Sequence, residues 1–383
     1  MSRVYLDYNA SAPIDERVLD FMIDVYKNQI GNADSRTHIF GEDVRRIVEN
    51  ARKQVASLLG VKSDEVFFTS GATESNNIAI QGLKEYAAES GRNHIVTTAI
   101  EHKAVLETVK NLEKEGFKVD FVTPDLSGRV KAGNILNQVN DRTLVVSVMH
   151  VNNETGMIQP VKEIGDELEK KAVLFHIDAT QSCGKLVDEL REIKYNMLSF
   201  SAHKLMGPQG VGALILRKKS YKLPPVKAIM YGGQQEHGIR PGTIPAALVA
   251  GCGKACELAE AEYGFNNEQA RQIKDGIVSM FDKSGLSYHI NGDQEYCVPG
   301  TLNICIEGVS SEALMISTKQ YCGISNGSAC TSRSYSPSYV LSAMGIAEDQ
   351  INSSVRISWG HGANKEEIFS GLQGLINVAK QMK

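Results

Sequence analysis

The sequence predicts an α/β protein whose large domain, over 15–260, is a mainly parallel sheet covered by helices. Short segments rich in apolar and β-branched residues alternate with amphipathic helical segments throughout this range. Most of the apolar segments end in small, polar or glycine-rich turns, which is typical of strands that lead into helices. After residue 260 the alternation changes. A smaller α+β domain is expected over 261–383, with residues 1–14 packed against it.

Each element follows from its apolar spacing. Apolar residues recur at helical intervals over 15–30 and 41–59, which predicts two amphipathic helices. Strands are then expected at 66–70, 94–99, 117–123, 143–151, 173–178 and 197–200, with helical segments between most of them. A long helix is expected near 244–263. The last part of the chain predicts strands at 287–293, 300–308 and 354–360, and an amphipathic helix from residue 365.

The composition excludes several classes of protein. Of the 383 residues, 42% are hydrophobic and 22% are charged, which is an ordinary globular balance. The net charge of −4 provides no basic field, so we expect no direct nucleic-acid binding. No apolar run reaches the roughly 18 residues of a membrane span, and the opening residues do not resemble a secretory signal. Neither membrane attachment nor export is expected.

The cysteines indicate a reducing compartment. There are seven, an odd number, and no two form a C-x-x-C pair. This pattern argues against a disulfide framework and favours a cytoplasmic location. Cys252 and Cys256 share one helix face, but they lack further ligands at zinc spacing. Core packing is therefore favoured for both, and no metal site is expected.

Lys204 is the central candidate for catalysis. The apolar run Met197–Phe200 ends in Ser201, and His203 and Lys204 follow before a glycine-rich turn. A lysine at the end of a strand is most often an exposed surface residue. In a partly apolar pocket, a lysine instead loses proton affinity, and its free amine can condense with a carbonyl as a Schiff base. The neighbouring residues favour this second interpretation.

Other polar residues follow predicted strands, at the sheet edge where ligands bind in open α/β sheets. The sequence GATES, with Ala72 and Thr73, either caps a helix or binds an anion at its N-terminus. Asp178 is either a helix cap or the partner of a pyridinium nitrogen, as pyridoxal phosphate (PLP) enzymes require. His102 is either structural or a ring that stacks on a cofactor and moves protons.

Three further residues have open alternatives. Asn153 and Gln181 lie in turns after strands, where they either stabilise the turn or donate a hydrogen bond to an aromatic ring oxygen. Arg356 lies inside an expected strand and needs a counter-charge. A substrate carboxylate and an internal salt bridge both satisfy that need.

Cys330 is the candidate nucleophile. It lies in SNGSACTSRSYSPSY, a run of small and polar residues without helical or strand periodicity, and Arg333 is nearby. Free cysteines are usually buried core residues. The polar surroundings and the arginine favour an exposed thiol with a lowered pKa, which is reactive as the thiolate.

Together these segments make the family recognisable. The chain resembles the cysteine desulfurases, class-V, fold-type-I PLP enzymes of the bacterial iron–sulfur-cluster and nitrogenase-maturation type. The matching segments follow the family's order and cover nearly the whole chain: YLDYNASAP, GATESNN, EHKAV, MHVNNETG, HIDATQSCGK, SFSAHKLMGPQGVGAL, RPGT, GSACTS and SVRISWG. DATQ, the HK of SAHK, and GSAC are the most specific in combination.

The resemblance implies a PLP cofactor and a role for each matching residue. Lys204 would hold PLP as a Schiff base, His102 would stack on the ring and move protons, and Asp178 would pair with the ring nitrogen. Asn153 and Gln181 would lie near the ring oxygen. The phosphate would be bound by Ala72, Thr73, Ser201 and His203. The substrate would be bound by Asn153, Arg356 and Asn32. Cys330 would accept the sulfur.

The implied reaction removes sulfur from L-cysteine and yields L-alanine and a persulfide on Cys330, which an acceptor protein then receives. Thr243 of RPGT would reach the phosphate of a neighbouring subunit, which implies a homodimer with shared active sites. Two departures from the family affect the details. GNADS replaces the usual GNPSS around Asn32, and the last helix is not followed by the longer tail with which many members dock a scaffold protein.

Several alternatives therefore stay open. The sulfur acceptor is an iron–sulfur scaffold, a tRNA thiolation enzyme or a DNA sulfur-modification system. A PLP lyase or aminotransferase of the same fold is the nearest different activity. A non-enzymatic subunit that scaffolds a sulfur-transfer complex is the alternative of another class.

Overall fold

The computed structural model describes residues 3–171, 173–327 and 337–383. Its largest sheet has seven strands in the order β2-β8-β7-β6-β5-β3-β4. Their bounds are β2 Val66–Thr69, β3 His94–Thr98, β4 Lys118–Val122, β5 Thr143–Met149, β6 Leu174–Asp178, β7 Met197–Ser201 and β8 Gly212–Leu216. In this sheet β8 runs opposite to the other six strands, so its pairings with β2 and β7 are antiparallel and the remaining pairings are parallel. The predicted α/β class with a mainly parallel sheet is confirmed.

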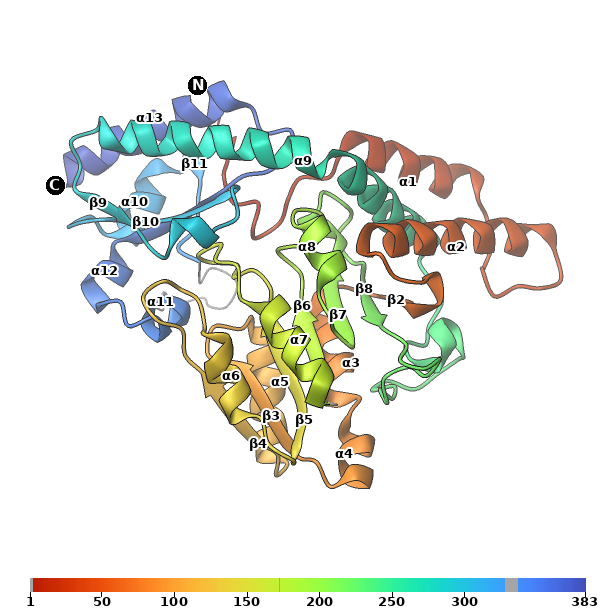
Figure 1. Ribbon diagram of the computed structural model, residues 1–383. Helices are drawn as coiled ribbons and strands as arrows, with labels where there is room; N and C mark the ends of the chain where they lie inside the picture. The colour runs from red at the N-terminus through yellow and green to blue at the C-terminus, as the bar shows by residue number, and fades with distance from the viewer. Residues whose placement is uncertain (1–2, 172, 328–336) are drawn as a thin grey trace.

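Helices cover both faces of this sheet (Figure 1). The helices before and between the strands are α1 Glu16–Asn28, α2 Ile39–Leu59, α3 Ala72–Gln81, α4 Lys84–Ser90, α5 Lys103–Lys114, α6 Ala132–Gln138, α7 Val161–Lys171 and α8 Val187–Glu192. Of these, α1 packs against the later helix over 246–282 rather than on the sheet. Successive strand residues point to opposite faces. Val96 and Phe175 accordingly pack into the core beneath α2, α6, α7 and α8, whereas Ile95 and Leu144 pack into the core beneath α3 and α5. Both faces of the central strands are buried, so these strands are mainly apolar. The edge strand β4 is partly exposed and carries Lys118 and Asp120.

The later part of the chain builds a three-stranded antiparallel sheet in the order β12-β10-β9. Its elements are β9 Tyr288–Ile290, β10 Thr301–Ile306, α10 Ser311–Thr318, β11 Cys322–Gly323, α11 Tyr339–Ala343, α12 Glu348–Asn352, β12 Ser354–Ser358 and α13 Lys365–Met382. The N-terminal strand β1 (Val4–Tyr5) pairs with β11, and Asp7 pairs with Ser358. The first residues of the chain therefore lie against its last quarter, as Figure 1 shows.

One long helix, α9 (Ala246–Asp282), connects the two cores. Its first half packs into the core of the large sheet through Val249 and Cys252, and its second half packs into the C-terminal core through Ile273 and Phe281. The prediction that this helix ends near residue 263 is wrong. The polar stretch after that residue is the exposed link between two apolar stripes rather than a loop. The expected domain boundary at residue 260 thus falls inside α9, and the division into two domains stays a prediction.

None of the helices in the described part of the chain combines the length and the apolarity that a bilayer span requires.

Candidate active site

The carboxyl ends of β5, β6 and β7 open onto one cavity. Its lining consists of Asn9, Ala10, Ala72, Thr73, His102, Met149, Val151, Asn153, Asp178, Thr180, Gln181, Ser201, His203, Lys204 and Arg356. Carboxyl ends of adjacent parallel strands meet at one sheet edge, which is why turns from distant parts of the sequence converge here. The cavity brings together most of the residues that the sequence singled out.

Lys204 ends a short 3₁₀ turn (Ala202–Lys204) directly after β7. Its amine donates to the backbone carbonyls of Asn9 and Ala10, both at 2.5 Å. The glycines after Lys204 have a packing reason: a Cβ on Gly207 would lie 2.9 Å from Ala202, and one on Gly212 would lie 2.3 Å from the Phe200 carbonyl oxygen. The turn therefore closes tightly and points the lysine into the cavity.

Asp178, the last residue of β6, is held by three donors. Its Oδ2 accepts a hydrogen bond from the Asn76 amide at 2.8 Å. Its Oδ1 accepts from the Thr180 backbone N–H at 3.0 Å and from the Thr180 hydroxyl. The carboxylate is only 4% exposed, so these contacts fix its orientation. Asn76 lies on α3 and is fully buried.

His102 caps the N-terminus of α5. Its Nδ1 accepts the Ala104 backbone N–H at 3.1 Å, so the ring proton resides on Nε2. Burial lowers the pKa of His102, while the nearby Asp178 opposes that shift. The ring is therefore neutral near pH 7, with one nitrogen already used by the helix.

The N-terminus of α3 forms one wall of the cavity. The Ala72 backbone N–H donates to the Ser201 hydroxyl at 2.7 Å, and Gly71, with φ of 147°, precedes the helix. A Cβ on Gly71 would lie 3.1 Å from the Ser201 oxygen. His203 contacts the Ser11 hydroxyl at 3.1 Å, and burial together with Lys204 lowers its pKa to about 4. A helix N-terminus with hydroxyl and imidazole groups is suited to a phosphate.

Arg356 on β12 reaches the cavity from the C-terminal sheet. It forms an ion pair of 2.6 Å with Asp7 and donates to the Asn153 backbone carbonyl at 2.9 Å. The internal salt bridge considered from the sequence is thus present. The Arg356 Nε and the Asn153 Oδ1 are nevertheless buried without a hydrogen-bond partner among the described residues. A ligand bound in the cavity would supply hydrogen-bond partners for these two atoms.

Gln181 is placed by two contacts. Its Nε2 donates to the Asn9 carbonyl at 2.9 Å, and its Oε1 accepts from the Lys185 amine at 3.4 Å. An ammonium group is only a donor, so Lys185 turns the amide oxygen of Gln181 toward itself. The amide NH₂ then faces the N-terminal segment at the cavity edge.

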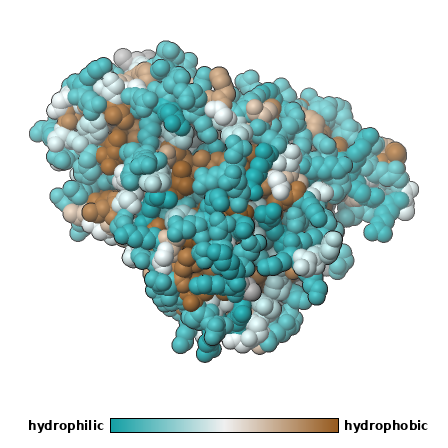
Figure 2. Space-filling view, in the orientation of Figure 1, coloured by the Kyte–Doolittle hydropathy of each residue, from teal (hydrophilic) through white to brown (hydrophobic). Residues whose placement is uncertain are grey.

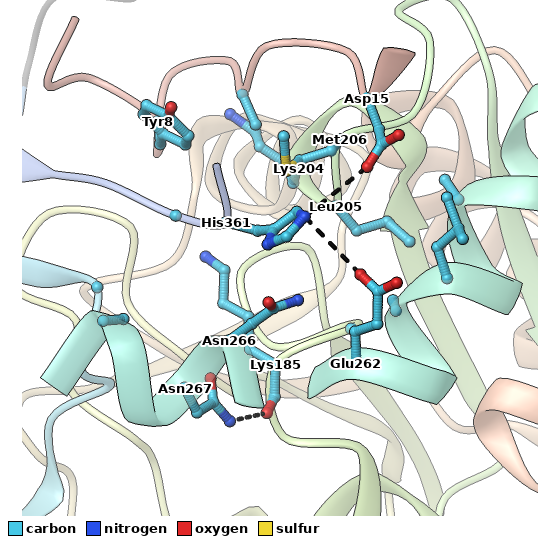
Figure 3. Close-up of a pocket in the computed structure, with 18 of the residues that line it drawn as sticks. Tyr8, Asp15, Lys185, Lys204, Leu205, Met206, Glu262, Asn266, Asn267 and His361 are labelled. Atoms are coloured by element: carbon cyan, nitrogen blue, oxygen red, sulfur yellow. Dashed lines mark hydrogen bonds and ion pairs between the residues drawn. The ribbon is translucent and has the colours of Figure 1, made fainter. Parts of the chain in front are cut away.

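A second cavity also reaches Lys204, between α9 and the N-terminal segment (Figure 3). The amine of Lys185 points into it, and burial lowers the pKa of Lys185 to about 8. On the opposite wall, His361 lies 3.9 Å from the Asp15 carboxylate and 3.7 Å from the Glu262 carboxylate. This cavity lacks Asp178 and His102, so it is distinct from the site at the sheet edge.

Some predicted residues lie elsewhere. Asn32 is half-buried and Thr243 is exposed, and neither lines the cavity. The Asn32 side chain accepts the Asp34 backbone N–H at 2.9 Å instead. Cys330 and Arg333 lie outside the described residues. Conversely, Asn76 and Asn9 contribute contacts that the sequence reasoning missed. Both lie inside segments that carry the family resemblance, GATESNN and YLDYNASAP. Their place in these segments was the sequence feature that could have identified them as site residues.

Comparisons with known proteins fit this geometry. The chain matches the aminotransferase class-V family over residues 4–370. Cysteine desulfurase IscS of Stutzerimonas stutzeri is 41% identical over 384 residues, which cover 99% of this chain and 93% of that protein. A NifS-like protein structure aligns with a TM-score of 0.91 and 35% identity over 99% of this chain and all of its own. A structure of SspA in complex with cysteine aligns with a TM-score of 0.81 and 34% identity over 93% and 98% of the two chains.

The chain therefore belongs to the class-V aminotransferase family of PLP-dependent enzymes. Within that family it groups with the cysteine desulfurases, which remove sulfur from L-cysteine.

Proposed function

We propose that the chain is a PLP-dependent cysteine desulfurase that converts L-cysteine to L-alanine and holds the released sulfur as a persulfide on Cys330. An acceptor protein then receives this sulfur. One observation carries the proposal: Lys204, Asp178 and His102, which come from three separate turns, line the same cavity. Asn153 Oδ1 and Arg356 Nε, on residues that line that cavity, are buried and have no hydrogen-bond partner in the part of the chain that the structure describes, which supports a bound cofactor and substrate.

PLP, when bound, supplies a carbonyl for Schiff-base formation and an aromatic ring that accepts electrons. The residues that would hold its phosphate are Ala72, Thr73, Ser201 and His203 around the start of α3. Asp178 would hold the proton on the ring nitrogen, and its three donors keep the carboxylate aimed at that position. Gln181 would donate its amide hydrogen to the ring oxygen.

Three residues carry the proton and sulfur steps. The Lys204 amine, when free, would remove the proton from the substrate Cα. Neutral His102 would lie beside the cofactor ring and exchange protons through Nε2, because Nδ1 is already used by the Ala104 N–H. The Cys330 thiolate attacks the substrate sulfur. The carbon–sulfur bond then breaks, the sulfur stays on Cys330 as a persulfide, and the carbon skeleton takes up protons to leave as alanine.

The substrate carboxylate would bind Arg356, with Asn153 beside it. Arginine offers a planar pair of donors that matches a carboxylate. Asn32 is a further candidate for the same carboxylate, although this chain places it outside its own cavity.

A homodimer with shared active sites is part of the proposal. Exposed apolar side chains gather on α1, on α2 and on the segment before Thr243: Leu19, Ile23, Tyr26, Ile30, Ile39, Phe40, Ile229, Met230 and Tyr231. Hydrophobic atoms reach the surface at the end of the molecule formed by the α1–α2 connection (Figure 2). Large exposed apolar patches mark interaction sites. Such an interface would allow Thr243 and Asn32 to reach the partner's cavity.

The location and the partners follow from the same features. The cysteines among the described residues are free, which supports a reducing cytoplasm. The net charge of −4 supports transfer of sulfur to a protein rather than direct binding of nucleic acid.

Two variants test the proposed function. Lys204→Ala should remove the yellow colour of the purified protein. Cys330→Ser should keep the colour but lose persulfide formation, measured by mass spectrometry of the intact chain after one equivalent of cysteine. A Cys330→Ser protein that transfers sulfur at the parental rate would show that the nucleophile is another residue.

A further inference from the structure

The carboxyl group of Glu154 lies between two residues that flank the segment 328–336. On one side, the Ser338 hydroxyl donates to Glu154 Oε2 at 2.5 Å. On the other side, a Cβ built on Gly327 would lie 2.5 Å from the same oxygen. Gly327 and Ser338 are eleven positions apart, and Cys330 lies between them in the sequence. One carboxyl group therefore contacts both ends of the segment that carries the nucleophile.

Glu154 is itself held firmly. It is 1% exposed, its backbone N–H donates to the Asn152 side chain at 2.9 Å, and its carbonyl accepts from Asn303 at 3.2 Å. The preceding residue is Asn153, which lines the cavity. The carboxyl group is thus fixed to the turn that contacts the substrate site.

The Ser338 end is anchored twice. Its hydroxyl accepts the Leu341 backbone N–H at 3.1 Å, which caps α11, while donating to Glu154. The next residue, Tyr339, donates its hydroxyl to the Glu101 carbonyl at 2.7 Å. The start of α11 therefore depends on Glu154 and on the turn before His102.

The Gly327 end is equally constrained. Its φ of 88° lies in the left-handed region, and its N–H donates to the Ser325 hydroxyl at 3.1 Å. Ser325 in turn pairs its backbone with that of Arg356. Any side chain at position 327 would press on the Glu154 carboxyl, so glycine is required both by backbone conformation and by space.

We propose that Glu154 is a positioning residue for sulfur transfer, because its carboxyl group accepts a hydrogen bond from Ser338 on one side of the Cys330 segment and packs closely against Gly327 on the other side, beside the substrate site. This inference depends on the proposed function, since it assumes that Cys330 is the acceptor. Fixing both ends of a short segment restricts the volume that its middle can explore. It thereby raises the effective concentration of the thiol near the substrate sulfur.

The charges around Glu154 agree with this role. Burial raises its pKa, and the Ser338 hydrogen bond, Arg356 and Lys103 oppose that shift. Among the described residues, Arg356 and Lys103 are the cations that act on this carboxyl group, and the proposed proton and sulfur steps do not use it. Its contacts are with the ends of the segment rather than with the cavity, whose lining does not include it.

The test separates substrate binding from sulfur transfer. For Glu154→Ala holoenzyme, we expect the parental cofactor absorbance. We also expect the cysteine concentration that gives half of the absorbance change to equal that of the parent. The rate of persulfide formation on Cys330 in the first turnover, followed by rapid quench and mass spectrometry, should fall at least tenfold. Glu154→Gln, which retains an acceptor for Ser338 and the same size, should stay within about threefold of the parent.

The matched control is Glu65→Ala. Glu65 is another buried glutamate, and its carboxyl accepts the backbone N–H groups of Lys62 and Lys218 rather than a hydrogen bond from Ser338. This control variant should leave the first-turnover rate unchanged. If Glu154→Ala loses its cofactor, Ser338→Ala provides the same test, because it removes only the donor to Glu154 and the α11 cap. Parental persulfide rates in either variant that retains the cofactor would overturn the inference. Absence of persulfide on Cys330 in the parent would instead overturn the proposed function.

Discussion

The Arg356 guanidinium and the Asp7 carboxylate form an ion pair of 2.6 Å, although 349 positions separate them in the sequence. Arg356 is on a strand of the C-terminal sheet, and Asp7 lies just after β1. The same guanidinium donates to the Asn153 carbonyl at the edge of the large sheet. This contact joins the N-terminal segment and both sheets at the proposed substrate site. A substrate carboxylate bound to Arg356, as proposed, would share that guanidinium with Asp7.

Replacing Asp7 tests that sharing. Asp7→Asn leaves the nearly buried Arg356 without its anionic partner, so the free energy of unfolding should fall. The loss should be less than the roughly 3–5 kcal/mol of a fully buried pair, because the Asp7 side chain is 17% exposed and asparagine retains an acceptor. Added L-alanine supplies a carboxylate, so it should raise the melting temperature of Asp7→Asn more than that of the parent. Equal shifts in the two proteins would contradict this view of the site.

Arg356→Lys addresses the same cation from the other side. Lysine keeps the charge but loses the paired, planar donors that match a carboxylate. The KM for cysteine should rise about tenfold or more, while the absorbance of the bound cofactor stays unchanged. Steady-state alanine release measures the first quantity and a spectrum the second. An unchanged KM would assign the substrate carboxylate to another residue, with Asn32 of a partner subunit as the next candidate.

The sequence predicted the fold class and the strand-end positions of the candidate site residues, but not the contacts that hold those residues. Asp178, His102 and Lys204 were identifiable because each follows an apolar strand, and parallel strands bring their carboxyl ends to one edge. The Asn76 contact to Asp178 was not, because it depends on how α3 is rotated against the sheet, which no local pattern encodes. The Asn9 and Ala10 carbonyls that contact Lys204 belong to backbone, which carries no side-chain signal.

The long helix α9 shows the same limit. Its first apolar stripe predicted a helix to about residue 263, and a second domain was expected to begin at residue 261. The apolar residues Ile273, Ile277 and Phe281 resume at intervals of four and pack into a different core. The helix continues because it serves two cores. A short sequence window contains only one of the two apolar stripes. Its pattern therefore does not distinguish an exposed stretch of helix from a loop.

Glu101 should make stability depend on pH. It is fully buried, accepts from the Thr98 hydroxyl and the Met149 backbone N–H, and burial raises its pKa from 4.5 to about 8. Between these values the folded state keeps a proton that the unfolded chain releases, so stability falls as pH rises from 4.5 to 8. Glu101→Gln removes that loss and should equal the parent near pH 4.5 but exceed it at pH 8. Urea unfolding at several pH values measures the difference, and two parallel curves would contradict it.

Lys185 should give a dependence of the opposite sign in a higher pH range. Its amine points into the second cavity (Figure 3), and its pKa is lowered from 10.5 to about 8 by burial, by Lys204 and by Arg356. Between pH 8 and 10.5 the unfolded chain binds a proton that the folded chain has released, so the parent gains stability as pH rises through this window. Below pH 8 the folded state holds a poorly solvated charge.

Lys185→Met removes that charge while keeping most of the side-chain volume. The variant should therefore be more stable than the parent at pH 7, and the two free energies of unfolding should converge by about pH 10.5. Lys110→Met, which removes a half-exposed lysine from the surface of α5, is the control and should show no such convergence. Denaturant titrations of all three proteins between pH 7 and 10.5 measure the effect. If Lys185→Met is less stable than the parent at pH 7, the contact with Gln181 must stabilise the ammonium group. The inference that the charged form of Lys185 destabilises the folded protein would then be wrong.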